Sequence, residues 1–157
     1  MKLFNIGLNP EASEKLAVEL NELLANFQVY YQNLRGLHWN IQGENFFELH
    51  VKFEELYDDS QEKIDLLAER ILTLGHTPLH TFEDYQKHAK VPVGKNVNQD
   101  RSALELIVNS LSILLEKERQ ILNLSDEADD EGTNSMMSDF IAEQEKLVWM
   151  FSAWLSK

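Results

Sequence analysis

Four long stretches of this chain repeat apolar residues every three to four positions, and few residues interrupt them. The whole sequence holds three prolines and six glycines in 157 residues. A chain with so few breakers can form long helices, whereas a fold of many short strands needs turn residues far more often. Any fold proposed for this chain has to satisfy that helical constraint.

The first two stretches carry start and stop signals. Asn9 followed by Pro10 predicts a helix start, because asparagine caps helices well and proline suits the first helical position. The apolar stripe of this helix ends near Gly36, and the helix can continue for another turn. The second helix is expected over residues 46–74, and Gly75 after it is typical of a helix end.

A long connection separates the second helix from the third. It covers residues 76–98, and residues 81–88 inside it are compatible with a short helix. The third helix is expected from about Gln99 to Leu124, and Thr133 is the expected cap of a fourth helix that runs to the C-terminus. Four helices with one long crossover between the second and third are typical of ferritin-like bundles. We therefore predict an all-α, ferritin-like four-helix bundle, folded as one domain over residues 1–157.

Composition excludes several kinds of chemistry. The chain has no cysteine, so disulfides, thiolate metal sites and cysteine nucleophiles are excluded. The formal net charge of −13 disfavours bulk attraction to DNA or to anionic membranes. The first residues lack the apolar core of a secretion signal, and no apolar run approaches the ~20 residues that span a membrane. We expect a cytoplasmic protein without membrane contact that attracts cations.

The second helix carries a row of candidate metal ligands. His50, Glu54, Asp65 and Glu69 fall at roughly 0°, 40°, 60° and 100° around the helix, so they share one narrow face. Along the axis, however, His50 and Asp65 are roughly 22 Å apart. They cannot bind one ion within one chain, and the sequence lacks the Glu-x-x-His pairs of the usual di-iron bundle. The face would hold two half-sites, His50 with Glu54 and Asp65 with Glu69.

Two copies of this helix, packed antiparallel about a two-fold axis, would complete both half-sites. The axis would pass near Asp59 and Ser60, midway along the face, and would create two equivalent sites in each dimer. Imidazole with carboxylate, in the absence of sulfur, suits iron(II), manganese or zinc.

A second interpretation of the same residues is open at this point. Acidic residues on a long surface helix commonly form a solvated face, and Lys52, Lys63 and Arg70 are placed to pair with them. His38, beside Trp39, is then a half-buried histidine with satisfied hydrogen bonds. The other histidines show no ligand spacing; they are His76, His80 and His88.

The sequence around these residues resembles the Dps family, the ferritin-like "DNA-binding proteins from starved cells". The resemblance is carried by residues 37–43 (LHWNIQG), 46–50 (FFELH), 53–57 (FEELY), 64–71 (IDLLAERI) and 149–151 (WMF). It covers essentially the whole chain. Its most specific part is a His-Trp-Asn motif followed by a histidine twelve residues after the first, and then by Asp-x-x-x-Glu.

This resemblance implies a twelve-subunit shell that oxidises iron(II), preferably with hydrogen peroxide, and stores iron(III) mineral inside, which protects the cell from oxidative damage. It implies a ferroxidase site at the two-fold interface, with two histidines from one subunit and two carboxylates from its partner. Trp39 matches the tryptophan beside the site, which intercepts radicals. At Glu54 the family more often has aspartate. The residues that match the family's metal ligands are His38, His50, Glu54, Asp65 and Glu69.

Two further expectations concern iron access and DNA. The acidic run at residues 126–131 resembles the family's iron-uptake pore at a three-fold axis, with Asp130 and Glu131 as the closest counterparts. The alternative for this run is a solvated acidic loop. DNA-binding members typically carry a Lys/Arg-rich tail, whereas the segment before Pro10 holds only Lys2. We therefore expect no DNA binding without a bridging divalent cation, and a DNA-compacting or structural shell is the alternative function.

Overall fold

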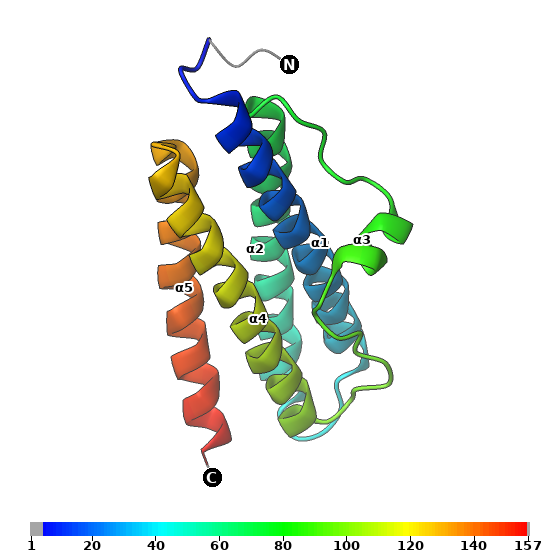
Figure 1. Cartoon of the computed structure of the whole chain (residues 1–157). Coiled ribbons are helices and arrows are strands. Elements are labelled where there is room, and N and C mark those ends of the chain that lie inside the picture. Colours follow the sequence, from blue (N-terminus) through cyan, green and yellow to red (C-terminus); the bar gives the residue numbers. More distant parts are fainter. Residues whose placement is uncertain (1–4, 157) are drawn as a thin grey trace.

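Four long helices lie alongside one another as a bundle, and a fifth, short helix packs on its side (Figure 1). The computed structural model describes residues 5–156, so Lys2 lies outside the described residues. The helices are α1 (Pro10–Asn40), α2 (Phe46–Thr73), α3 (Phe82–His88), α4 (Asp100–Glu127) and α5 (Glu131–Leu155). The predicted all-α bundle, with one long crossover between its second and third long helices and a short helix inside that crossover, is confirmed.

The predicted apolar stripes meet in one continuous core. Leu20, Phe53, Leu67 and Leu111 have no exposed surface, and Phe140 of α5 packs edge-on against Phe27 of α1 with ring centroids 5.9 Å apart. Fully burying each of these large apolar side chains contributes about 1.5–3 kcal/mol. Across residues 5–156, no helix is both long enough and apolar enough to cross a membrane.

Three asparagines of α1 hold the crossover against the bundle. The Asn26 Oδ1 atom accepts hydrogen bonds from the backbone N–H groups of Lys90 and Val91, at 2.7 and 2.9 Å. Asn33 bonds the backbone of residues 92 and 94, and Asn21 bonds the backbone of residues 77 and 79. These bonds give the polar backbone of an irregular segment the partners it needs where it packs on the bundle.

The helix ends agree with the expected ones in one case and differ in two. Helix α1 continues one turn past Gly36 to Asn40, as the sequence allowed, which places His38 in its last turn. Helix α4 runs to Glu127 rather than ending at Leu124, so part of the acidic run is helical. The prediction that Thr133 caps the last helix is wrong. Asp130 is the cap, and its side chain accepts a hydrogen bond from the Thr133 N–H at 3.1 Å.

Candidate metal centre

The end of α1 and the start of α2 bring two histidine rings face to face. The ring centroids of His38 and His50 are 3.8 Å apart, and the planes differ by 12°. His38 Nδ1 donates to the carbonyl oxygen of His50 at 2.6 Å, and His50 Nδ1 donates to the carbonyl oxygen of His38 at 2.7 Å. Because a carbonyl oxygen only accepts, both Nδ1 atoms carry the proton. In the neutral ring, Nε2 is then the unprotonated nitrogen that can bind a metal ion.

The turn between α1 and α2 makes this pairing possible. Ile41 ends α1 with its side chain buried in the core, and its N–H bonds the carbonyl of Leu37. Gly43 then adopts a φ of 110°, in the region that favours glycine, and its carbonyl accepts from the N–H of Phe46. The chain reverses within five residues, from Ile41 to Asn45, so that the first turns of α2 lie beside the last turn of α1.

Aromatic rings enclose the histidine pair. Phe46 stacks on His50 with ring centroids 5.0 Å apart, and the rings of Tyr57 and His38 meet edge to face with centroids 5.3 Å apart. His38 is buried and His50 is partly exposed. This packing restricts both rings to one orientation before any metal ion arrives, and it lowers the local dielectric around them.

Tyr57 contacts two of the candidate ligands, and the sequence reasoning did not single it out. Its hydroxyl donates to Glu54 Oε1 at 3.3 Å. Partial burial, followed by the charge of Glu54, raises the pKa of Tyr57, so the hydroxyl keeps its proton and stays a donor. Its spacing carried a signal, because Tyr57 follows Glu54 by three residues and His50 by seven and therefore shares their side of α2.

Trp39 lies next to His38 in the chain but faces solvent, with 57% of its surface exposed. The guanidinium of Arg35 sits 4.9 Å from the centroid of its ring, which is a cation–π contact, and 5.5 Å from that of Tyr31. An indole in this position is accessible to small molecules in solution, and it is one residue away from a candidate metal ligand.

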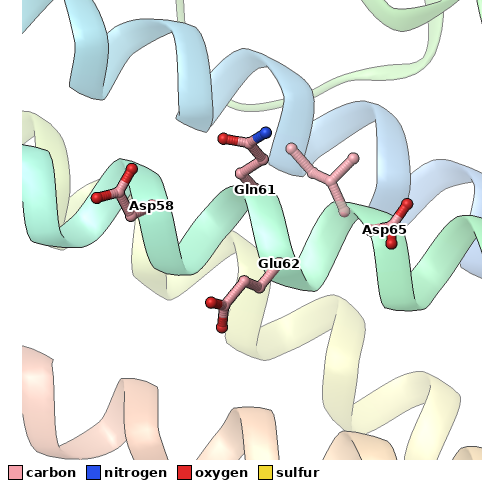
Figure 2. Close-up of a pocket in the computed structure, with 5 residues that line it drawn as sticks. Asp58, Gln61, Glu62 and Asp65 are labelled. Atoms are coloured by element: carbon pink, nitrogen blue, oxygen red, sulfur yellow. The ribbon is translucent and has the colours of Figure 1, made fainter.

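The two remaining ligand candidates lie further along α2 and are both exposed. Asp65 helps to line an open pocket on the outer side of the helix, together with Asp58, Gln61 and Glu62 (Figure 2). Glu69 follows one turn later. Among residues 5–156, no three histidine, aspartate or glutamate side chains are grouped so that they could hold a metal ion. Within one chain, then, the predicted ligands stand in two separate sets.

The cations of α2 are committed to other carboxylates. Lys52 pairs with Glu55 at 3.4 Å. Lys63 pairs with both Asp59 and Glu143, and Arg70 pairs with Asp130. Within the described part of the chain, none of these three cations forms an ion pair with Glu54, Asp65 or Glu69. This arrangement favours the ligand interpretation over a face of self-neutralising charges.

The middle of this face, where the two-fold axis is predicted to pass, is formed by residues next to Asp59 and Ser60. Ser60 is buried and its hydroxyl bonds the carbonyl of Leu56, so it cannot meet a second copy. Asp59 is bound to Lys63. At that height along the helix, Asp58 and Gln61 face outward instead.

Comparisons with known proteins identify the family. The family model of the ferritin-like domain matches residues 18–157. The DNA protection during starvation protein of Porphyromonas gingivalis is 45% identical over 151 residues, which is 96% of this chain and 95% of that protein. This chain belongs to the ferritin-like family, and within it to the Dps proteins.

Solved Dps structures agree in fold. The crystal structure of a Dps protein from Vibrio cholerae O1, described as a member of the ferritin-like diiron-carboxylate superfamily, is 57% identical with a TM-score of 0.94. It covers 96% of this chain, and this chain covers 94% of it. A Dps variant from Listeria innocua is 31% identical, with a TM-score of 0.87. The match covers 90% of this chain and 95% of that chain, and two histidines of the variant are replaced by glycine. Those histidines are twelve residues apart, like His38 and His50.

The acidic segment of this Dps chain divides into buried and exposed carboxylates. Asp130, expected as a lining residue of an iron-uptake pore, is only 2% exposed, and its carboxylate bonds Arg70 at 2.5 Å and the Thr133 hydroxyl at 2.5 Å. Asp130 therefore has a structural role as the cap of α5 and the partner of Arg70, and the pore role expected for it stays a prediction. The acidic side chains of this segment that are exposed are Asp126, Glu127, Asp129 and Glu131.

Proposed function

We propose that this Dps chain oxidises iron(II) at sites shared between two copies, and that it retains the iron(III) product as mineral inside a shell of twelve subunits built from two-fold dimers. One observation carries the proposal. Two stacked histidines have both Nδ1 protons bound to backbone carbonyls, which leaves two Nε2 atoms as metal ligands at one end of a carboxylate-bearing helix face.

The numbering of α2 supports an antiparallel pairing of two copies. Residues 50 and 69, and residues 54 and 65, are symmetric about a single point, position 59.5. An antiparallel partner centred there would set Glu69 opposite His50 and Asp65 opposite Glu54, in two copies related by symmetry. Each complete site would then combine the histidines of one chain with the carboxylates of the other.

Exposed apolar residues support the same register. Phe47 is 80% exposed and Leu72 is 54% exposed, and these two residues are also symmetric about position 59.5. An antiparallel partner would therefore cover each Phe47 with a Leu72. Burying such side chains between copies removes apolar surface from water, which favours association.

The ligand set suits iron as a substrate that is oxidised and passed on. Carboxylate oxygens favour the more highly charged iron(III), whereas imidazole helps to retain iron(II). Two iron(II) ions can each give one electron to one hydrogen peroxide molecule, which takes up two protons and leaves as two waters. Peroxide that is reduced by two electrons at once releases no hydroxyl radical, and Trp39 is placed to intercept radicals that do form. Zinc and manganese are expected to compete for the same ligands.

Anaerobic iron(II) titration followed by rapid mixing with peroxide or oxygen tests this function. His50→Gln should abolish high-affinity binding and fast oxidation. His88→Gln, a change at an exposed histidine of α3, should leave both unchanged. Equal binding and rates in the two variants would contradict the proposal, and the rates with the two oxidants in the unmodified protein give its oxidant preference.

DNA compaction is the second candidate function, because the Porphyromonas gingivalis relative is named for DNA protection. The net charge of −13 opposes it, since phosphate binding requires several cations in one patch. In a gel-shift assay at physiological salt, we expect plasmid to migrate unchanged when no divalent cation is present. Retardation under those conditions would favour the second function.

A further inference from the structure

A buried carboxyl group and a buried amide meet in the interior of the bundle. Glu118 of α4 has no exposed surface, and Gln144 of α5 is 3% exposed. Gln144 Nε2 donates to Glu118 Oε2 at 2.7 Å. The proposed iron ligands lie on other elements, α1 and α2, so this pair is a separate feature of the fold.

The hydrogen bond between these residues leaves one side-chain oxygen of each residue without a donor in the described part of the chain. Glu118 Oε1 and Gln144 Oε1 are both buried and have no hydrogen-bond partner among the described residues. If Glu118 were a carboxylate, both atoms would be acceptors without a donor in a region closed to solvent. Leaving two buried acceptors unsatisfied is unfavourable, and a buried charge in addition makes it more so.

The nearest cations are committed elsewhere. Lys63 of α2 reaches the same part of the core, but its ammonium bonds Asp59 at 2.7 Å and Glu143 at 2.6 Å. Arg119, the next residue on α4, pairs with Glu145. Within residues 5–156, Glu118 is therefore a buried acid without a cation bound to it.

The remaining charged and polar groups around the pair do not compensate for it. Tyr30 of α1 is buried, and its hydroxyl has no hydrogen-bond partner in the described part of the chain, so it donates to neither unmatched oxygen. Glu143 of α5 adds negative charge near Glu118, and Asp59 of α2 adds negative charge near Tyr30. An ionised Glu118 would place another negative charge close to Glu143, which is unfavourable.

We propose that Glu118 is a protonated, neutral acid at neutral pH, and that its Oε1–H donates to Gln144 Oε1, which closes a two-bond acid–amide ring in the bundle core. One proton supplies the missing donor for both unmatched oxygens. The pair is thus a proton-binding site built by α4 and α5. Burial is the main cause that raises the pKa of Glu118, to about 8, and the Gln144 hydrogen bond and the Lys63 charge only partly oppose it.

The proton couples the bundle's stability to pH. The folded chain keeps this proton up to about pH 8, whereas the unfolded chain releases it near the ordinary value of 4.5. Between these values the folded state holds more protons, so its stability falls as pH rises. The contribution is complete below about pH 4.5 and lost once the pH has passed through about 8.

Infrared spectroscopy of the assembled protein at pH 6.5 tests the proposal. Nearly all other carboxyl groups are ionised at that pH, so a neutral carboxylic acid gives an isolated carbonyl band at higher wavenumber than the carboxylate bands. We expect this band in the unmodified protein and in Glu116→Gln, an exposed change two residues away on α4, and not in Glu118→Gln. The glutamine at 118 can form the same two-bond ring with Gln144, so the variant should fold.

Isotope labelling makes the result independent of any variant. Carboxyl-¹³C glutamate should shift the band of the unmodified protein, and the band should disappear between about pH 7 and pH 9 if the group is Glu118. If the assembled, labelled protein has no neutral glutamic acid band at pH 6.5, Glu118 is ionised and the proposal is wrong. A band that persists unchanged in assembled Glu118→Gln also overturns it.

Discussion

His38 and His50 hold each other in place, because each ring donates its Nδ1 proton to the backbone carbonyl of the other residue. A metal-binding histidine usually takes this orienting bond from a residue that is not itself a ligand. Here both orienting bonds run within the pair, and the aromatic stacking at 3.8 Å adds to them. Each ring is therefore oriented by a backbone carbonyl of the opposite helix and by contact with the other ring.

The stacking of the two rings predicts non-additive losses of iron(II) affinity. Replacing His38 with alanine removes one ligand and also the ring that stacks on His50, so the single change should weaken anaerobic binding by about 10–100-fold or more. His50→Ala should do the same. The double variant should then be much less impaired than the product of the two single losses, because the residues act as one unit. Losses that multiply would show that the rings act independently.

Tyr57 should tune the site through Glu54. Tyr57→Phe keeps the ring against His38 and removes only the hydroxyl that bonds the carboxylate. Losing a bond that orients a ligand should weaken iron(II) binding by about tenfold, with little change in thermal stability. Tyr85→Phe is the matched control, since that hydroxyl bonds the backbone of the crossover. An unchanged affinity in Tyr57→Phe would show that the Tyr57 hydroxyl does not tune the site.

Much of this architecture could be predicted because helices repeat regularly. The spacing of the apolar residues gave the bundle, and the angle of 100° per residue placed Glu54, Asp65 and Glu69 on one face of α2. Both results require only local geometry. The same spacing predicts where along α2 the two-fold axis would pass. It does not predict which side chains point outward there, because the burial of Ser60 depends on how α2 packs in the bundle.

The features that sequence could not provide depend on contacts between distant residues. Asp130 was expected at a pore, and its partner Arg70 lies sixty residues earlier in the chain. Only the packing of α2 against the start of α5 reveals that this carboxylate is buried. The mutual bonds of the two histidines likewise depend on the turn at Gly43, whose positive φ cannot be deduced from ligand spacing.

Asp130 should be important for stability. Asp130→Asn leaves the guanidinium of Arg70 without its buried partner and weakens the cap of α5. Removing one member of a buried ion pair costs about 3–5 kcal/mol, and part of that cost should appear here because Arg70 keeps some exposure. Denaturant unfolding measures the loss. Glu131→Gln, a change at an exposed neighbour, should alter stability by less than about 0.5 kcal/mol, and equal effects would contradict the structural role of Asp130.

The exposed acids of the same segment should instead affect iron uptake. Asp126→Asn combined with Glu131→Gln should slow iron(II) oxidation at low salt and leave the proposed ligands intact. Attraction of a divalent cation over a distance is screened by salt, with a Debye length of about 10 Å at 0.1 M. The difference between variant and parent should therefore shrink as salt increases. Identical rates at low salt would indicate that these acids are only solvated.

The sharing of each site between two chains can be measured by mixing variants. His50→Ala and Asp65→Ala shells should each be inactive, because every site in them lacks a ligand. After the two are dissociated, mixed in equal amounts and reassembled, random pairing should restore about a quarter of the sites, since half of the dimers are mixed and each has one intact site of two. Rapid-mixing iron(II) oxidation measures the recovery in shells shown by mass spectrometry to contain both chains. Recovery near a quarter of the parent rate is the predicted result, and no recovery in such mixed shells would contradict a site shared between copies.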